Sequence, residues 1–146
     1  MATFSRARKI RFAHTDAAGI AFYPRYFGMI NDFIEDWFGD GLGFDFKHLH
    51  IDEKRAVPTV HIEADFVGAS RMHDELAFNL NVTKIGTSSI HLKIWATSGG
   101  EDRFRMTFVI AHMDMETGKS LPWPGDMRAA MEKWLTPNLA PEGDPS

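Results

Sequence analysis

One long helical pattern followed by a run of two-residue alternations is the feature that most limits how this chain can fold. The helical pattern is a stripe of apolar residues at helical spacing: Tyr26, Phe27, Ile30, Phe33, Ile34, Trp37 and Phe38. Such a stripe is typical of an amphipathic helix that buries one face. Pro24 suits the first turn of this helix, and Gly39 suits the position directly after its last residue.

The alternations predict strands that each bury one face of a sheet. Four stretches have this pattern: residues 60–66, 76–82, 90–96 and 104–110. In the first of them, the buried face is expected to carry Val60, Ile62, Ala64 and Phe66. Gly86 and the pair Gly99-Gly100 separate the last three stretches, so hairpins are expected to connect them.

A fifth, shorter strand is predicted near the start of the chain, where Ile10 and Phe12 alternate with charged or small residues. A brief final helix is expected over residues 127–134. One sheet with one apolar face and one helix to cover it predicts a two-layer α+β domain, with the strands curled around the helix. We expect a single domain over residues 1–136 and a flexible tail over residues 137–146.

Composition excludes several functional classes. Sixteen Lys and Arg against 20 Asp and Glu give a net charge of −4 with scattered basic residues, which argues against nucleic-acid binding. The absence of cysteine removes disulfides, thiolate zinc sites and a cysteine nucleophile. No stretch approaches the roughly 18 to 20 apolar residues of a membrane span, so a cytoplasmic protein without membrane contact is expected. His48 and His50 have no third ligand at a suitable spacing, so no metal is expected.

The densest group of chemically special residues is the segment from His14 to Phe27, between the first strand and the helix. Asp16 supplies a carboxylate, and Gly19 lets a ligand approach the backbone. The helix that follows offers free N–H groups at its start, which attract developing negative charge. A carboxylate beside oxyanion donors suits acyl transfer, with Asp16 either attacking a carbonyl or drawing a proton from water. An aspartate that only caps a turn is the simpler alternative.

Two motifs in this segment resemble the signature of the hotdog-fold 4-hydroxybenzoyl-CoA thioesterase family: Asp16-Ala17-Ala18-Gly19-Ile20 and Tyr23-Pro24-Arg25-Tyr26. The resemblance extends over roughly residues 9–114. It implies the hotdog fold, in which a five-stranded antiparallel sheet wraps around one long helix. It also implies hydrolysis of acyl-CoA thioesters with no metal or other cofactor, since coenzyme A is part of the substrate.

The same resemblance implies an assembly of several copies. Members of the family form homodimers that join two sheets edge to edge, and these dimers are often paired again as homotetramers. Trp95, Val109 and Ala111 put apolar surface on the face of the sheet away from the helix, which also suggests a contact between copies.

Carried over residue by residue, the resemblance makes Asp16 the catalytic carboxylate and places Tyr23 where a helix amide faces the thioester carbonyl. A tyrosine at this place resembles the aryl-CoA enzymes, since the related thioesterases of the Tol-Pal system have a histidine there. The candidate acyl contacts are Gly19, Ile20, Phe22, Tyr26, Asn31, Thr59 and His61. Asn31 stands where the 4-hydroxybenzoyl enzyme has an aspartate, which argues against a 4-hydroxybenzoyl substrate.

The candidate CoA contacts are Lys84, Ser88 and Ser89, in and beside a turn that has hydroxyls where the related enzyme has a basic run. The sequence thus predicts a thioesterase for an aryl- or medium-chain acyl-CoA. Two alternatives remain open: a hotdog module that binds acyl-CoA or an aromatic ligand without catalysis, and a hotdog enoyl-thioester hydratase. The hydratase would need a histidine at another spacing, because His14 lies on the wrong side of Asp16.

Overall fold

The computed structural model describes residues 2–136, so the predicted tail at residues 137–146 lies outside the described residues. Its main elements are β1 (Phe4–Lys9), α1 (Tyr23–Asp36), β3 (Thr59–Phe66), β4 (Glu75–Ile85), β5 (Ser89–Ser98), β6 (Glu101–Ala111) and α2 (Gly125–Glu132). The short elements are the helical turns η1 (Phe12–His14), η2 (Trp37–Leu42) and η3 (Lys47–Asp52) and the strands β2 (Arg55–Ala56) and β7 (Met113–Asp114).

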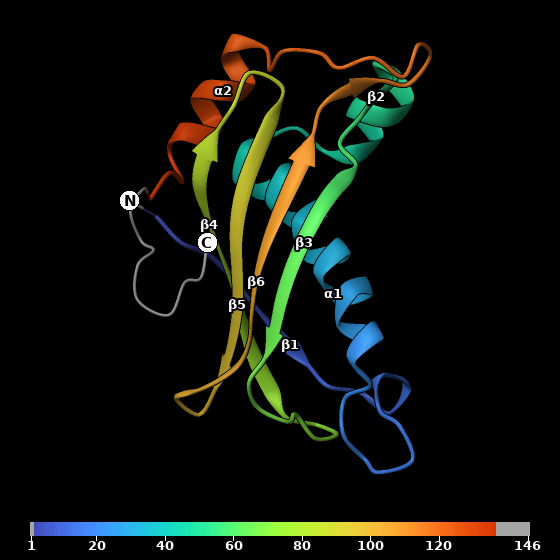
Figure 1. Cartoon of the computed structure of the whole chain (residues 1–146), viewed down its shortest axis with the longest axis vertical. Coiled ribbons are helices and arrows are strands. Elements are labelled where there is room, and N and C mark those ends of the chain that lie inside the picture. The colour runs from blue at the N-terminus through green and yellow to red at the C-terminus, as the bar shows by residue number, and fades with distance from the viewer. Residues whose placement is uncertain (1, 137–146) are drawn as a thin grey trace.

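One antiparallel sheet with the strand order β1-β4-β5-β6-β3 forms the body of the protein, and α1 lies along it (Figure 1). Hairpins connect β4, β5 and β6 as predicted. The strands β2 and β7 pair separately, at the end of the molecule where α1 stops (Figure 1). This architecture confirms the predicted α+β class, a five-stranded antiparallel sheet with one long helix.

The core lies between α1 and the inner face of the sheet. The rings of Phe33 and Phe78 meet edge to face with centroids 5.7 Å apart, and those of Phe78 and Phe104 do so at 5.2 Å. All three side chains are fully buried. Aromatic pairs of this kind contribute about 0.5–1.5 kcal/mol beyond the burial of their area. The core therefore fixes α1 against the sheet, and with it the loop that leads into the helix.

The helical path continues past the predicted end at Gly39. Beyond α1 the chain forms η2, a wider helical turn in which Trp37, Phe38 and Leu42 are buried. The helical path ends at Gly43 rather than at Gly39. Gly43 has a φ of 86°, and its N–H donates a hydrogen bond to Phe38 O. The predicted boundary is wrong because one more turn buries a further apolar side chain.

The first strand lies earlier than predicted. β1 ends before Ile10, and Phe12 is 76% exposed in η1. The sequence gives little sign of this strand because Arg6 and Arg8 occupy alternate, half-buried positions where apolar residues would be expected. Both arginines form salt bridges with aspartates of η2 and α1, which allows charged side chains to lie against the core.

The expected buried face of β3 is largely exposed in one copy of the chain. Val60, Ile62 and Phe66 are 61%, 41% and 44% exposed, and Ala64 is half-buried. Ile62, Ala64 and Phe66 lie on the same face as the buried residues of β6, but β3 is an edge strand with a neighbour on one side only. The register shifts between Thr59 and His61, so Val60 departs from this alternation. The prediction of burial is therefore wrong for the single chain, because an edge strand needs a further partner to cover it.

Candidate active site

A tight hairpin carries Asp16 to the start of α1. The Asp16 N–H donates to Ile20 O at 3.0 Å, and the Phe22 N–H donates to His14 O at 2.9 Å. Gly19 makes the turn with a φ of 78°, a conformation that favours glycine, and a Cβ there would meet nothing within 4 Å. The loop thus lies directly at the N-terminal end of the helix, with open space over Gly19 (Figure 1).

The carboxylate of Asp16 is exposed and only partly engaged. Its Oδ1 accepts a hydrogen bond from the Ala18 N–H at 2.9 Å, which closes an Asx turn. The other oxygen accepts no hydrogen bond within residues 2–136. Because an ionised carboxylate has about four acceptor positions, Asp16 can cap this turn and still act on a ligand or a water. The turn-capping and catalytic interpretations are therefore compatible.

The first turn of α1 leaves one amide without a hydrogen-bond partner among the described residues. The helix begins at Tyr23, Pro24 occupies the next position as predicted, and Phe22 provides no side-chain cap. Proline has no N–H, and the Arg25 N–H is already bonded to Phe22 O at 2.8 Å. The first amides of a helix have no partner within it. The Tyr23 N–H is thus the donor that the helix dipole offers to a negatively charged group.

A cavity of about 340 Å³ opens beside this helix start. Its walls come from the loop, from α1 and from the end of β3: Ile20, Ala21, Tyr23, Tyr26, Phe66, Val67, Gly68, Ala69 and Ser70. Three predicted site residues, Ile20, Tyr23 and Tyr26, thus share one cavity. The ring centroid of Phe66 lies 5.7 Å from that of Tyr23 and 6.0 Å from that of Tyr26. Such walls can hold an aromatic or alkyl acyl group.

The hydroxyl of Tyr26 is buried and finds no hydrogen-bond partner within the described part of the chain. Burial raises the pKa of this phenol, and the positive charge of Arg103 offsets only part of the effect. The phenol is therefore neutral at physiological pH. Because its oxygen is inaccessible, a ligand in the cavity would meet carbon atoms of the ring.

Asn31 and Thr59 lie elsewhere, in a cavity of about 310 Å³ between α1 and the start of β3. Asp32 and Glu35 line this second cavity as well. Asn31 follows Tyr23 by eight residues, a separation of about 12 Å along a helix. Four predicted acyl contacts of one copy are therefore divided between two cavities, with Ile20 and Tyr26 in the first and Asn31 and Thr59 in the second.

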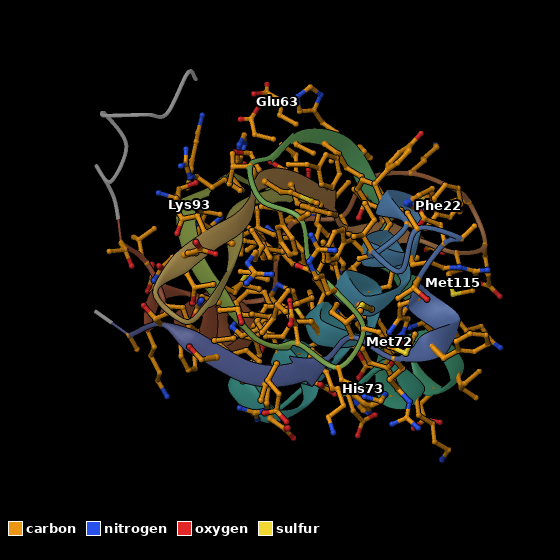
Figure 2. All side chains as sticks on the ribbon, turned by 90° about the horizontal axis from the view of Figure 1, so that it is seen from below. Phe22, Glu63, Met72, His73, Lys93 and Met115 are labelled. Atoms are coloured by element: carbon orange, nitrogen blue, oxygen red, sulfur yellow. The ribbon has the colours of Figure 1, made fainter. Side chains whose placement is uncertain are left out.

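Phe22 stays in the loop of Asp16, as the residue directly before α1, but four other candidates lie away from this loop. His61 is on the outer face of the sheet and bonds to Glu63 through its Nε2 at 3.1 Å, and Figure 2 shows Glu63 on the outside of the molecule. The CoA candidates Lys84, Ser88 and Ser89 lie beside the turn between β4 and β5, at the end opposite to the start of α1 (Figure 1). One copy of the chain does not bring them to the carboxylate.

His14 belongs to its own turn rather than to a pair with Asp16. Its Nδ1 accepts a hydrogen bond from the Arg11 N–H at 2.9 Å, and burial together with Arg11 and Arg25 lowers its pKa. Within residues 2–136, no group of three His, Asp or Glu side chains is placed to hold a metal ion. None of the helices described there is long and apolar enough to cross a membrane.

The family model described as the thioesterase-like superfamily matches residues 10–131 of the chain. The chain belongs to this superfamily. The family resemblance carried by the two motifs around Asp16 and Tyr23 is thereby confirmed. The hotdog fold is confirmed as well, since solved thioesterase structures superpose on this thioesterase-like chain over most of its length.

Named relatives of this superfamily member include a 1,4-dihydroxy-2-naphthoyl-CoA hydrolase of Synechocystis, which is 28% identical over 89 residues. The match covers 58% of this chain and 60% of that protein. A crystal structure of a 1,4-dihydroxy-2-naphthoyl-CoA thioesterase from Synechocystis has a TM-score of 0.80 at 20% identity, covering 89% of this chain and 96% of the other. The structure of a gentisyl-coenzyme A thioesterase has a TM-score of 0.79 at 23% identity, covering 88% of this chain and 99% of the other.

Proposed function

We propose that this thioesterase-like protein hydrolyses an aryl- or medium-chain acyl-CoA to the free acid and CoA. The observation that carries the proposal concerns the loop of Asp16, which contributes Ile20 and Ala21 to the cavity and leads into the Tyr23 amide, while one carboxylate oxygen of Asp16 accepts no hydrogen bond from residues 2–136. A carboxylate, an oxyanion donor and an acyl pocket are the parts that thioester hydrolysis needs. Water is the second substrate, no cofactor takes part, and the enzyme acts in the cytoplasm.

In the proposed reaction the thioester carbonyl oxygen points at the Tyr23 N–H, where the dipole of α1 stabilises the developing negative charge. Asp16 then acts in one of two ways. It draws a proton from water so that the hydroxide adds to the carbonyl, or it attacks the carbonyl itself and water hydrolyses the resulting mixed anhydride. In both routes the C–S bond breaks, CoA leaves as a thiolate that takes up a proton, and the carboxylate of Asp16 is regenerated.

An aromatic acyl group is the substrate class that we favour. The rings of Tyr23, Tyr26 and Phe66 give the cavity walls on which a flat ring can pack. The similar proteins described above are named for the aromatic thioesters 1,4-dihydroxy-2-naphthoyl-CoA and gentisyl-CoA. We therefore expect the acyl group to carry a ring rather than a short alkyl chain.

We further propose a homodimer joined at β3, because the two edges of the sheet differ in character. β1 carries Arg6 and Arg8, and charged edge strands resist pairing with another chain. β3 instead exposes Val60, Ile62 and Phe66 together with an unpaired backbone edge. A second copy of β3 would cover these side chains and extend the sheet.

Pairing of β3 with itself would also assemble the site. In an antiparallel pair, the Phe66 end of one strand lies beside the Thr59 end of the other. The cavity at Tyr23 in one copy would then lie near the Asn31 cavity of its partner, and the β4–β5 turn would approach the partner's catalytic loop. A homotetramer would add a contact through the outer face of the sheet, where Trp95 is half-buried.

Replacing Ile62 with aspartate is expected to separate the dimer into monomers and to remove most of the activity. Ile62 lies near the middle of β3, so each new carboxylate would be buried close to its symmetry mate without a partner. Sedimentation equilibrium should give the mass of one chain. The control is Met115→Asp, which changes an exposed apolar residue outside β3 and should leave the dimer intact. A fully active monomer would contradict the interface.

A panel of acyl-CoA esters tests the activity itself. We expect kcat/KM for aromatic thioesters to exceed that for acetyl-CoA by about 10-fold or more, because a small acyl group leaves the cavity unfilled. The chain contains no cysteine, so a thiol-reactive dye reports only the CoA that is released. No turnover across the whole panel, with binding retained, would contradict the thioesterase assignment.

The ligand-binding module is the second candidate, because the Oδ1 of Asp16 caps a turn as a purely structural aspartate would. The hydratase is less favoured, since the Nδ1 of His14 is bonded within its own turn. The variants of Asp16 described in the Discussion distinguish the thioesterase from the module.

A further inference from the structure

The loop of Asp16 lies on a second segment, residues 67–74, which begins in the wall of the acyl cavity but contributes no group to the proposed bond-making and bond-breaking steps. The Ala21 N–H donates to Ser70 O at 2.7 Å, and the Met72 N–H donates to Gly19 O at 3.3 Å. Figure 2 views the molecule from this end and shows Met72 at its surface. Because main chain is bonded to main chain, the position of the loop depends on the position of residues 67–74.

One side chain of β6 holds this segment. The Nη1 of Arg103 donates to Ala69 O at 2.9 Å, to Ser70 Oγ at 3.2 Å and to Asp74 Oδ2 at 2.9 Å. The Arg103 side chain is only 11% exposed. Hydrogen bonds from a charged donor are about twice as strong as neutral ones, so this guanidinium is a firm attachment.

The backbone of residues 67–74 packs closely against β6 at Arg103. A Cβ on Gly68 would come within 2.8 Å of Asp102 O and 3.4 Å of Arg103 Cδ, so a larger residue could not pass this close to β6. The N–H groups of Val67 and Gly68 both donate to Arg103 O, at 3.0 and 3.2 Å. His73 has a φ of 71°, which a residue with a side chain keeps only when its surroundings hold it there.

Asp74 is the last residue of the segment, and its carboxylate binds both Arg71 and Arg103. Its Oδ2 accepts hydrogen bonds from the Arg71 N–H at 2.9 Å and from Arg103. The bond from the Arg71 N–H, followed by the one from Arg103, lowers the pKa of the Asp74 carboxyl. Asp74 is therefore ionised at neutral pH, and its ion pair with Arg103 persists under assay conditions.

We propose that Arg103 is a positioning residue for the hydrolysis, which acts through residues 67–74 to hold the loop that carries Asp16. The inference rests on the proposed function, because Arg103 has this role only if Asp16 takes part in the reaction. Arg103 touches no reacting atom. It fixes the main chain beneath the loop, and a displacement of about 1 Å in a catalytic group can cost about 10²-fold in rate.

Replacing Arg103 with methionine removes the three hydrogen bonds while keeping an aliphatic stem. We expect kcat to fall by about 10- to 100-fold, with KM for the same acyl-CoA changed by less than about twofold. Arg103→Lys keeps the charge but not the planar fork and should give an intermediate kcat. The matched control is Arg105→Met on the same strand, which removes only an exposed pair with Asp102 and should leave kcat unchanged.

Amide hydrogen exchange separates positioning from a general loss of stability. In Arg103→Met, the amides of Ala21 and Met72 should exchange faster, whereas those of β4 and β5 keep their parental protection. A parental kcat, or equal acceleration of exchange at every amide, would overturn the proposal. If Arg103→Met does not fold, Ser70→Ala removes one of the three acceptors and should still lower kcat several-fold; a parental kcat there would count against the proposal in the same way.

The Asp16→Asn variant shows which hypothesis has failed if the outcome is negative. Parental hydrolysis by Asp16→Asn would reject the proposed function, and the role of Arg103 with it. Loss of hydrolysis in Asp16→Asn together with parental kcat in a folded Arg103→Met would reject only the role of Arg103.

Discussion

Replacing Asp16 with asparagine is expected to lower kcat for acyl-CoA hydrolysis by about 10²- to 10⁴-fold with little change in KM. Asparagine keeps the Oδ1 acceptor for the Ala18 N–H, so the Asx turn should persist. It lacks the negative charge that attacks the carbonyl or takes a proton from water. The measurement is the release of CoA at saturating substrate, with the unfolding temperature recorded to show that the fold is intact.

Asp114 provides a matched control for this experiment. Its Oδ1 accepts a hydrogen bond from the Glu116 N–H at 2.8 Å, the same two-residue turn that Asp16 forms, but at the other end of the molecule. Asp114→Asn should therefore hydrolyse acyl-CoA at the parental rate. If Asp16→Asn does so too, Asp16 is a turn-capping residue only, and the ligand-binding module replaces the thioesterase.

The long helix and the three hairpin-connected strands could be predicted because each repeats its apolar residues at one period over a long stretch. Periodicity records which side of an element faces the core, and it fails where tertiary contacts override it. In β1, Arg6 and Arg8 take core-facing positions because acidic residues neutralise them. At Gly39, burial of Leu42 favours a further helical turn over the expected end.

The sequence likewise predicts those residues of the candidate site that are close together in the chain, but not those that only the folded sheet brings together. Asp16 and Tyr23 are close in the sequence, so a short motif is enough to place them together. Phe66 and Arg103 reach the same end of the molecule only through the pairing of β3 with β6, in which Phe66 lies opposite Phe104. No local pattern records that register, so neither Phe66 nor Arg103 could be assigned to the site before the sheet was known.

A proline in place of Tyr23 is the second change for which we expect a large effect, because it removes a single N–H group. That amide is the proposed oxyanion donor, and the first helical position tolerates proline. Phe22 before it has φ of −76° and ψ of 118°, an extended conformation that suits a following proline. Loss of one such donor typically costs about 10²- to 10³-fold in kcat, which the release of CoA would measure.

Tyr23→Ala separates the amide from the side chain, since it keeps the N–H but loses the ring that lies against Phe66. We expect it to weaken the binding of aromatic thioesters while kcat changes far less. If Tyr23→Pro folds and hydrolyses acyl-CoA as fast as Tyr23→Ala does, the Tyr23 N–H is not the oxyanion donor. The carboxylate of Asp16 and this amide would act on the same transition state. The reductions in kcat caused by removing each of them should therefore not be additive. The double variant Asp16→Asn/Tyr23→Pro should therefore be little slower than Asp16→Asn alone.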